Sequence, residues 1–158
     1  MMRFTFTAII LAALVMPGAA LAERKLPYWA SISAGKARMR SGPGRQFPAT
    51  WMYQRVGLPV KVLEIYPNWR KIEDPDGTTG WVQGNLLSDN RTAIVMGGIH
   101  EMRGAADASA PVVWRAEPGV VGALTQCDRG WCLFDVKGRT GYIEIAHIWG
   151  AKPDERLP

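Results

Sequence analysis

The residues most able to do covalent chemistry in this chain are two cysteines and two histidines. A cysteine hydrolase needs a thiolate beside a histidine base, and the candidates are Cys127 or Cys132 with His100 or His147. The cysteines stand five residues apart around the turn-forming segment 128–130. On strands that flank a turn, this spacing places the two Cβ atoms within disulfide reach. We therefore predict a structural disulfide, with a reactive thiol or two inert free thiols as the alternatives.

The other chemistry-bearing residues do not form a catalytic or metal-binding set. Zinc needs three or four convergent ligands, and only the histidines and scattered carboxylates remain once the cysteines pair. The densest acidic patch, Glu73, Asp74 and Asp76, surrounds a Pro-Asp-Gly sequence that is typical of a solvated turn. The glycine-rich segment 41–44 lacks the lysine and helix of a phosphate loop. We therefore expect no catalysis, no metal and no cofactor.

Binding is better supported, because basic and aromatic side chains gather in the first half of the chain. Residues 27–88 carry eight basic and four acidic side chains, whereas residues 89–150 carry six and seven. The basic excess lies between residues 36 and 55, where Trp51 and Tyr53 are interleaved. Arginine and aromatic side chains together can hold a carboxylate while stacking on an apolar or sugar face. A solvated basic face without a ligand is the alternative.

The N-terminus reads as a secretory signal peptide. Arg3 precedes an apolar run over residues 4–16, and an Ala-Leu-Ala site ends at Ala22. We expect cleavage after Ala22 (signal peptide 1–22) and export to the periplasm, with an uncleaved anchor as the alternative. No later apolar run is long enough to span a bilayer, so the mature chain is expected to have no transmembrane segment. An oxidising periplasm also favours the disulfide.

The rest of the 158 residues is organised by an internal repeat. Four landmarks recur in the same order with nearly fixed spacing: Met39-Arg40 and Met102-Arg103, Trp51 and Trp114, Trp69 and Trp131, Gly80-Trp81-Val82 and Gly141-Tyr142-Ile143. The repeat divides the chain into units at 27–88 and 89–150, followed by a charged tail at 151–158. The short link at 88–92 favours a fixed relation between the units.

Each unit predicts several short strands and no long helix. Segments such as 49–56 are rich in residues that favour strands. The 17 glycines and 11 prolines supply frequent turns. Short strands with turns every 8–12 residues indicate a small all-β barrel or sandwich.

The order of these motifs resembles the bacterial Src-homology-3-like (SH3b) domain. The resemblance rests on Met39-Arg40, the loop 41–44, Gly57-Leu58-Pro59-Val60, Asn68 to Ile72, and Asp76-Gly77 with Gly80-Trp81-Val82. The second unit looks like a divergent copy, and its closing Ile148-Trp149-Gly150 and charged tail look like exported alphaproteobacterial members. The resemblance implies an all-β fold of two tandem small SH3-like barrels, five strands each, and an exported binding role.

These features together predict a non-catalytic exported binding or targeting protein. The expected partner is peptidoglycan or an envelope peptide, and export argues against nucleic acid. The ligand-binding candidates are Arg38, Arg40, Trp51, Tyr53 and Tyr66, the two tyrosines because they occur in one unit only. A periplasmic protein-interaction scaffold is the first alternative. A cysteine-dependent envelope hydrolase is the second.

Overall fold

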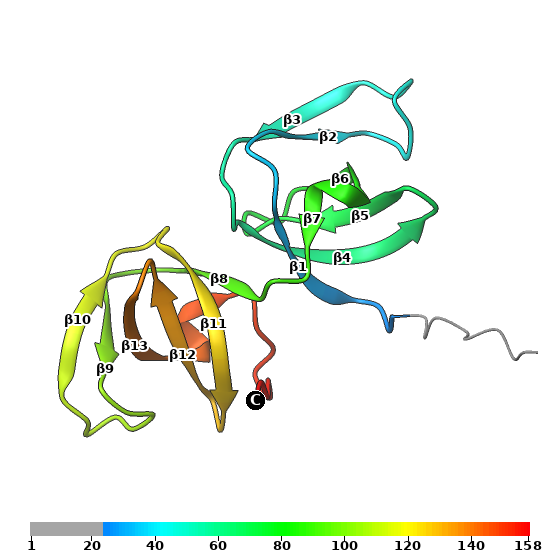
Figure 1. The fold of residues 1–158 in the computed structure, drawn as a ribbon. Coiled ribbons are helices and arrows are strands. Elements are labelled where there is room, and N and C mark those ends of the chain that lie inside the picture. The colour runs from blue at the N-terminus through cyan, green and yellow to red at the C-terminus, as the bar shows by residue number, and fades with distance from the viewer. Residues whose placement is uncertain (1–23) are drawn as a thin grey trace, which may run out of the picture.

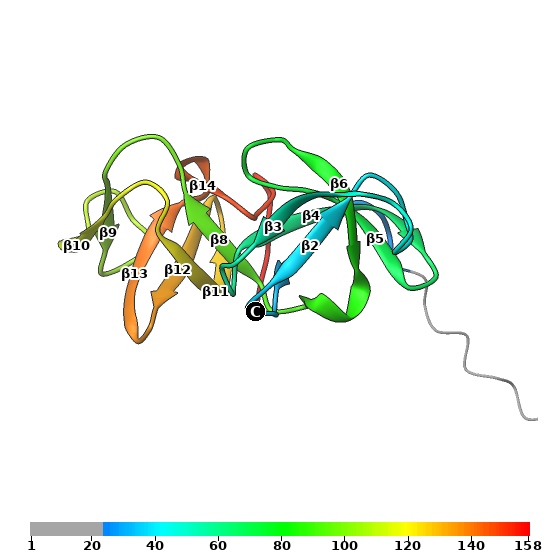
Figure 2. The ribbon, with the colours of Figure 1, turned by 90° about the horizontal axis from the view of Figure 1, so that it is seen from above.

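The computed structural model describes residues 24–158, which form two strongly curled β-sheets (Figure 1). The signal peptide predicted over residues 1–22 lies outside the described residues. Seen from above, the sheets are two barrels that lie side by side (Figure 2). Across residues 24–158, no helix has the length and apolar character needed to cross a membrane.

The first sheet has seven antiparallel strands in the order β3-β2-β6-β5-β4-β1-β7. They are β1 (Tyr28–Ile32), β2 (Ala37–Arg40), β3 (Ala49–Tyr53), β4 (Pro59–Tyr66), β5 (Trp69–Glu73), β6 (Thr79–Gln83) and β7 (Leu87–Ser88). A 3-10 turn, η1 (Gly84–Leu86), joins β6 to β7.

The second sheet repeats this topology in the order β10-β9-β13-β12-β11-β8-β14. Its strands are β8 (Thr92–Val95), β9 (His100–Arg103), β10 (Val112–Ala116), β11 (Val121–Asp128), β12 (Trp131–Val136), β13 (Arg139–Glu144) and β14 (Ile148–Trp149), with the 3-10 turn η2 (Ile145–His147) before β14. Both sheets therefore confirm the all-β tandem fold. Each has seven strands rather than the five that the resemblance implies, because the segments that enter and leave each barrel also pair with each other.

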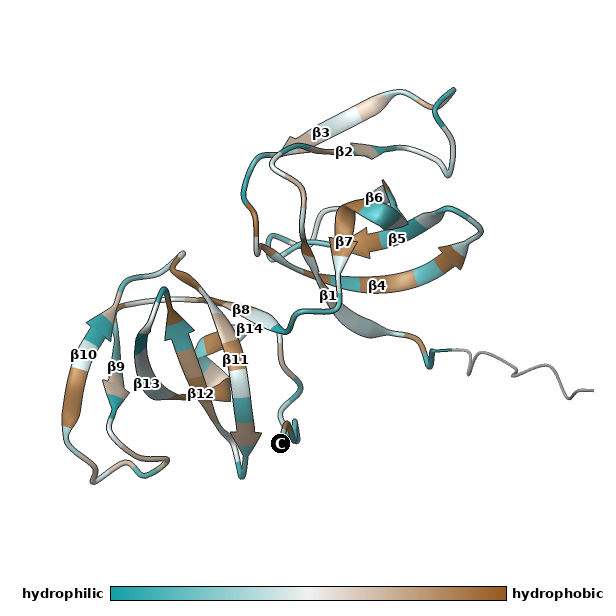
Figure 3. Cartoon of the chain, in the orientation of Figure 1, coloured by the Kyte–Doolittle hydropathy of each residue, from teal (hydrophilic) through white to brown (hydrophobic). Residues whose placement is uncertain are grey.

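Each barrel has its own apolar core, built by the alternation of side chains along the strands. Val60 and Val62 on β4 are fully buried together with Ile72 and Val82, and polar and apolar residues succeed one another along β4 (Figure 3). In the second barrel Phe134 is the largest fully buried side chain. Two separate clusters of this kind explain how two units of about 60 residues are stable, since units of that size are otherwise marginal.

The glycine of the Gly-Trp-Val motif is required by a close approach between strands. A Cβ on Gly80 would lie 2.4 Å from Cγ of Met39, and one on Gly141 would lie 2.6 Å from Cβ of Met102. Real Cβ atoms do not approach other carbons so closely, so only glycine lets the β2–β3 and β9–β10 hairpins fold across their barrels. The recurrence of this glycine in both units is therefore a packing requirement.

Aromatic side chains join the two barrels. The rings of Trp29 on β1 and Trp149 on β14 meet edge to face, with centroids 4.7 Å apart. The Lys61 ammonium lies 5.2 Å from the Trp29 centroid and 5.8 Å from the Trp149 centroid. An aromatic pair with a shared cation fixes the barrels against each other beyond what the short link imposes.

The predicted disulfide is present. Cys127 and Cys132 face each other in the β11–β12 ladder, with Cα atoms 4.1 Å apart, and are bonded. The residues of the tail also reach this strand, because Leu157 donates its N–H to the Cys127 carbonyl and accepts the Cys127 N–H in return. Arg91 holds the tail through Glu155 at 3.0 Å. The charged tail is thus packed against the second barrel.

Removing the disulfide is expected to destabilise the second barrel by about 2 kcal/mol, the loop-closure entropy of its short loop. The variant is Cys127→Ala with Cys132→Ala, because both side chains are buried and alanine adds no polar atom. Urea unfolding of the variant and of the oxidised protein measures the difference. Two free thiols titrating in the unfolded, unreduced protein would contradict the bond itself.

Candidate functional site

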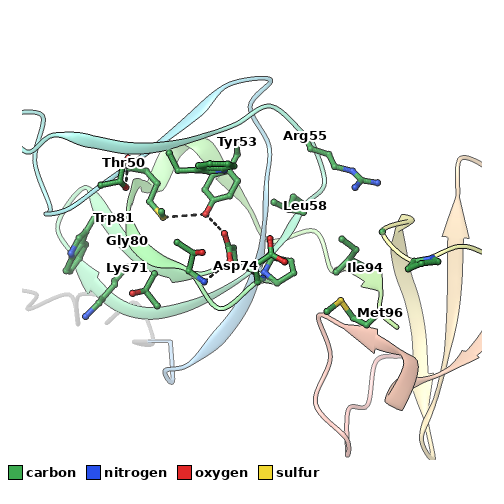
Figure 4. Close-up of a pocket in the computed structure, with 18 of the residues that line it drawn as sticks. Thr50, Tyr53, Arg55, Leu58, Lys71, Asp74, Gly80, Trp81, Ile94 and Met96 are labelled. Carbon is green, nitrogen blue, oxygen red and sulfur yellow. Dashed lines mark hydrogen bonds between the residues drawn. The ribbon is translucent and has the colours of Figure 1, made fainter. Parts of the chain in front are cut away.

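A groove of about 890 Å3 lies beside the first barrel. It lies between β3, the turn that joins β5 to β6, and the end of β8 in the second barrel (Figure 4). First-barrel side chains lining the groove include Met39, Trp51, Tyr53, Arg55, Lys71, Asp74, Asp76 and Trp81. The second barrel contributes Ile94, Met96, Pro118 and Gly119. The groove is therefore mostly apolar and aromatic, with charged groups of both signs.

The inner wall of the groove is held by a tyrosine and a buried carboxylate. The Tyr53 hydroxyl donates to Oδ2 of Asp74 at 2.9 Å, as Figure 4 shows. Oδ1 of Asp74 accepts the backbone N–H groups of Asp76 and Thr78 at 3.0 and 2.9 Å. The turn expected at this place is present, but the prediction that its acids are solvated is wrong for Asp74. That side chain is buried, and it accepts one hydrogen bond from β3 and two from backbone N–H groups of its own turn.

Burial, with the Asp74 carboxylate beside the hydroxyl, raises the pKa of Tyr53 above its ordinary value of 10.0. The unfolded chain therefore loses this proton at lower pH than the folded protein. The contribution of the protonated Tyr53 hydroxyl to the stability of the fold is fully present below pH 10.0 and is lost as the pH rises toward the raised pKa.

The free energy of unfolding is accordingly expected to fall as the pH rises above 10.0. Tyr53→Phe is expected to remove the part of this decline that comes from deprotonation of Tyr53. Urea unfolding at a series of alkaline pH values measures it. Tyr66→Phe, at an exposed tyrosine, is the matched control and should keep the full decline. The same decline in Tyr53→Phe as in the control would contradict the assignment.

The two tryptophans at the same repeat position adopt opposite arrangements. Trp51 on β3 is 61% exposed, whereas Trp114 on β10 is only 9% exposed. The Trp114 indole N–H donates to the Thr140 carbonyl at 2.7 Å, and Arg139 covers the ring at 4.9 Å from its centroid. The indole of Trp114 thus fills its own barrel, while that of Trp51 is left beside an open groove.

The residues two positions further along each strand explain the difference. Tyr53 is buried in the first barrel, and alanine, Ala116, stands at the equivalent place in the second. Residues i and i+2 of a strand point to the same face, so the small side chain of Ala116 leaves room for the Trp114 indole. The partner of Tyr53 changes as well, because Val136 stands where the first barrel has Asp74.

The five predicted ligand-binding residues do not form one site. Arg38 pairs with Met52 across the β2–β3 ladder, whereas Trp51 and Tyr53 pair with Met39 and Ala37. Cross-strand partners share a face and successive residues alternate. The arginines that are interleaved with the aromatics in sequence therefore lie on the opposite face of the hairpin.

Comparison with known proteins bears on the family. A family model described as the bacterial SH3 domain matches residues 33–89 and 98–150. The chain belongs to the bacterial SH3 domain family. No protein of curated function matches it.

Among the solved structures that match, two resemble most of this chain, though only distantly. They are NlpC1 and NlpC2 from Trichomonas vaginalis, each with 8% sequence identity and a TM-score of 0.34. The matches cover 87% and 80% of this chain and 50% and 49% of those chains. The chain therefore spans about half the length of either solved protein.

Within this pair of bacterial SH3 domains, the predicted residues divide between two places. Trp51 and Tyr53 line the groove. Tyr66 lies beside it, since its exposed ring meets Trp81 edge to face at 6.4 Å. Arg38 and Arg40 line a separate basic cavity. A ligand-binding role for these five residues stays a prediction.

Sequence reasoning missed several groove residues. Lys71 supplies a cationic group in addition to Arg55, which the basic excess of the sequence already included, and Ile94 and Met96 come from the other SH3 domain (Figure 4). The contribution of the second barrel depends on how the barrels pack, which no local pattern indicates. The tyrosine–aspartate pair could have been noticed, because its two positions differ together between the repeats.

The candidates for cysteine chemistry are engaged elsewhere. Both cysteines are in the disulfide. His100 and His147 stack on each other with centroids 3.9 Å apart, and the His100 Nε2 lies 2.8 Å from the Met96 carbonyl oxygen. In the part of the chain that the structure describes, no three His, Cys, Asp or Glu side chains are grouped to hold a metal ion.

Proposed function

We propose that this protein is a non-catalytic, exported binding protein of the bacterial envelope whose first SH3 domain holds a stem peptide of peptidoglycan. The observation that carries the proposal is the groove, where the exposed Trp51 and the half-buried Trp81 border an open cavity. An apolar groove with a few polar groups is the usual form of a ligand site.

The chemistry of the groove suits such a peptide. Its aromatic walls accept small apolar side chains, and a cation at its rim can pair with a carboxylate. Arg55 is exposed and takes part in no ion pair among residues 24–158, whereas Lys71 is paired with Glu64 at 2.7 Å. Arg55 is therefore the cation that we assign to a ligand carboxylate.

The second SH3 domain is not assigned this binding. The indole of Trp114 already fills the place that corresponds to the open side of the groove, and its N–H is bonded to Thr140. We assign this domain a supporting role, because Ile94 and Met96 form the far wall of the groove.

Co-sedimentation of the purified protein with purified sacculi, across a salt series, tests the proposed function. The protein is expected in the pellet at low salt, with weaker binding as salt screens the Arg55 contribution. Absence from the pellet even at the lowest salt would remove the proposal. A reduced sample serves as a control, because binding by this groove does not require the disulfide.

Trp51→Ala is expected to weaken binding to sacculi more than about tenfold, since exposed tryptophans at binding sites are common energetic hot spots. The side chain is 61% exposed, so the variant should remain folded. Tyr142→Ala, at a partly exposed aromatic residue of the second barrel that does not line the groove, is the matched control. Sedimentation of Trp51→Ala equal to that of the parent would place the ligand on another surface.

A periplasmic scaffold is the second candidate, and one observation favours it. β10 is an edge strand of the second sheet, and Val112 and Val113 on it are exposed. An unprotected apolar edge can add a strand from a partner protein. Val113→Lys would block that addition and leave sedimentation with sacculi unchanged, which separates the two candidates.

A further inference from the structure

A second cavity is strongly positive. It lies on the face of the β2–β3 hairpin that carries the arginines. It has a volume of about 450 Å3 and is lined by four basic side chains, Lys36, Arg38, Arg40 and Arg45, which we call the basic pocket. No carboxylate lines it. Among residues 24–158, none of these four side chains takes part in an ion pair.

The second barrel contains the corresponding cavity with its charge neutralised. That cavity is lined by Ile99, Glu101, Arg103 and Glu144, among others. The repeat places Ile99 at the position of Lys36, Glu101 at that of Arg38, and Glu144 at that of Gln83. Two glutamates therefore replace an arginine and a glutamine, and the cavity provides its own anions.

Arg40 and Arg103 occupy equivalent positions in the two cavities, and comparing them shows that the basic pocket lacks a carboxylate partner. Arg40 donates through Nη1 to the Phe47 carbonyl at 2.7 Å, and Arg103 donates through Nη1 to the Ala110 carbonyl at 2.8 Å. Each guanidinium is thus anchored on its hairpin loop in the same way. Nη2 of Arg103 then binds Glu101 at 2.6 Å, whereas the described hydrogen bonds of Arg40 use Nη1 alone.

We propose that the basic pocket of the first barrel binds a phosphate or diphosphate group, which takes the place that the Glu101 carboxylate has in the second barrel. One carboxylate is enough for Arg103, but the basic pocket gathers four cations, and that charge matches a multiply charged oxyanion. Guanidinium groups bind phosphate oxygens in a bidentate manner. Met52 and Leu86 on the wall of the pocket leave an apolar surface for the organic part of a diphosphate ester.

This site is independent of the proposed peptide groove, because it lies on the other face of the hairpin. Isothermal titration of the purified protein with pyrophosphate tests it. Pyrophosphate is expected to bind more tightly than inorganic phosphate, and more tightly than citrate, which is also multiply charged but has no phosphate oxygens.

Arg38→Glu, which installs the residue of the second barrel, is expected to weaken pyrophosphate binding more than tenfold. Arg38 is exposed, so the variant should fold. Arg156→Glu, at an exposed arginine of the tail, is the charge-matched control and should bind as the parent does. No heat at low salt, equal binding by Arg38→Glu, or citrate binding as tightly as pyrophosphate would each overturn the proposal.

A further experiment distinguishes a phosphate on a lipid headgroup from a soluble phosphate. Flotation with phosphatidylcholine vesicles, with and without phosphatidic acid, reports a lipid headgroup, and competition by soluble pyrophosphate shows whether the same pocket is used. Following the Arg40 side-chain signal by NMR during the pyrophosphate titration places the anion. A shift of that signal supports the site, and its absence while heat is released contradicts it.

Discussion

Trp114→Ala is expected to lower the free energy of unfolding by about 3–5 kcal/mol, the usual cost of removing a large aromatic side chain from a core. The indole is 9% exposed, and its N–H is bonded to the Thr140 carbonyl. Its loss would leave a cavity beside Gly141, where an added Cβ would lie 2.9 Å from the indole nitrogen. Urea denaturation followed by circular dichroism measures the change.

The matched control is the same substitution at the equivalent position of the first barrel. Trp51→Ala removes an exposed side chain and is expected to change the unfolding free energy by less than about 0.5 kcal/mol. The two variants together test whether the tryptophan at this repeat position stabilises the second barrel but not the first. Equal destabilisation by both substitutions would contradict this division.

Asp74→Ala is expected to destabilise the first barrel by about 3 kcal/mol. The substitution leaves the Tyr53 hydroxyl and the N–H groups of Asp76 and Thr78 without their acceptor. An unmade hydrogen bond at a buried group costs about 1–3 kcal/mol. Thermal or urea unfolding measures the loss.

Asp74→Asn is the conservative control, because the amide oxygen can still accept the two backbone N–H groups. It is expected to cost clearly less than alanine. A loss of stability in Asp74→Ala within about 0.5 kcal/mol of the parent would mean that the buried carboxylate does not hold the turn onto β3.

The fold could be predicted because its signals are local and occur twice. The glycine of the Gly-Trp-Val motif recurs as Gly80 and Gly141, where strands approach too closely for a Cβ. The cysteine spacing across the turn at 128–130 also sufficed for the disulfide, since a tight hairpin fixes which residues face each other.

The candidate site could be predicted only in part. Proximity in sequence groups Arg38 and Arg40 with Trp51 and Tyr53, but strand alternation places the arginines and the aromatic residues on opposite faces of the hairpin. The burial of Asp74 depends on a contact with Tyr53 from a strand 21 residues away. The wall formed by Met96 depends on the packing of two barrels, which has no local signature.

We propose that the open groove of the first barrel binds peptidoglycan peptides and that the second barrel, which Trp114 fills, does not. Titration of soluble peptidoglycan fragments into nitrogen-15-labelled protein, followed through the indole N–H signals, tests it most directly. The signals of Trp51 and Trp81 are expected to shift with added fragment, while that of Trp114 stays in place. A shift of Trp114 with Trp51 unmoved, or no shift at all, would contradict it.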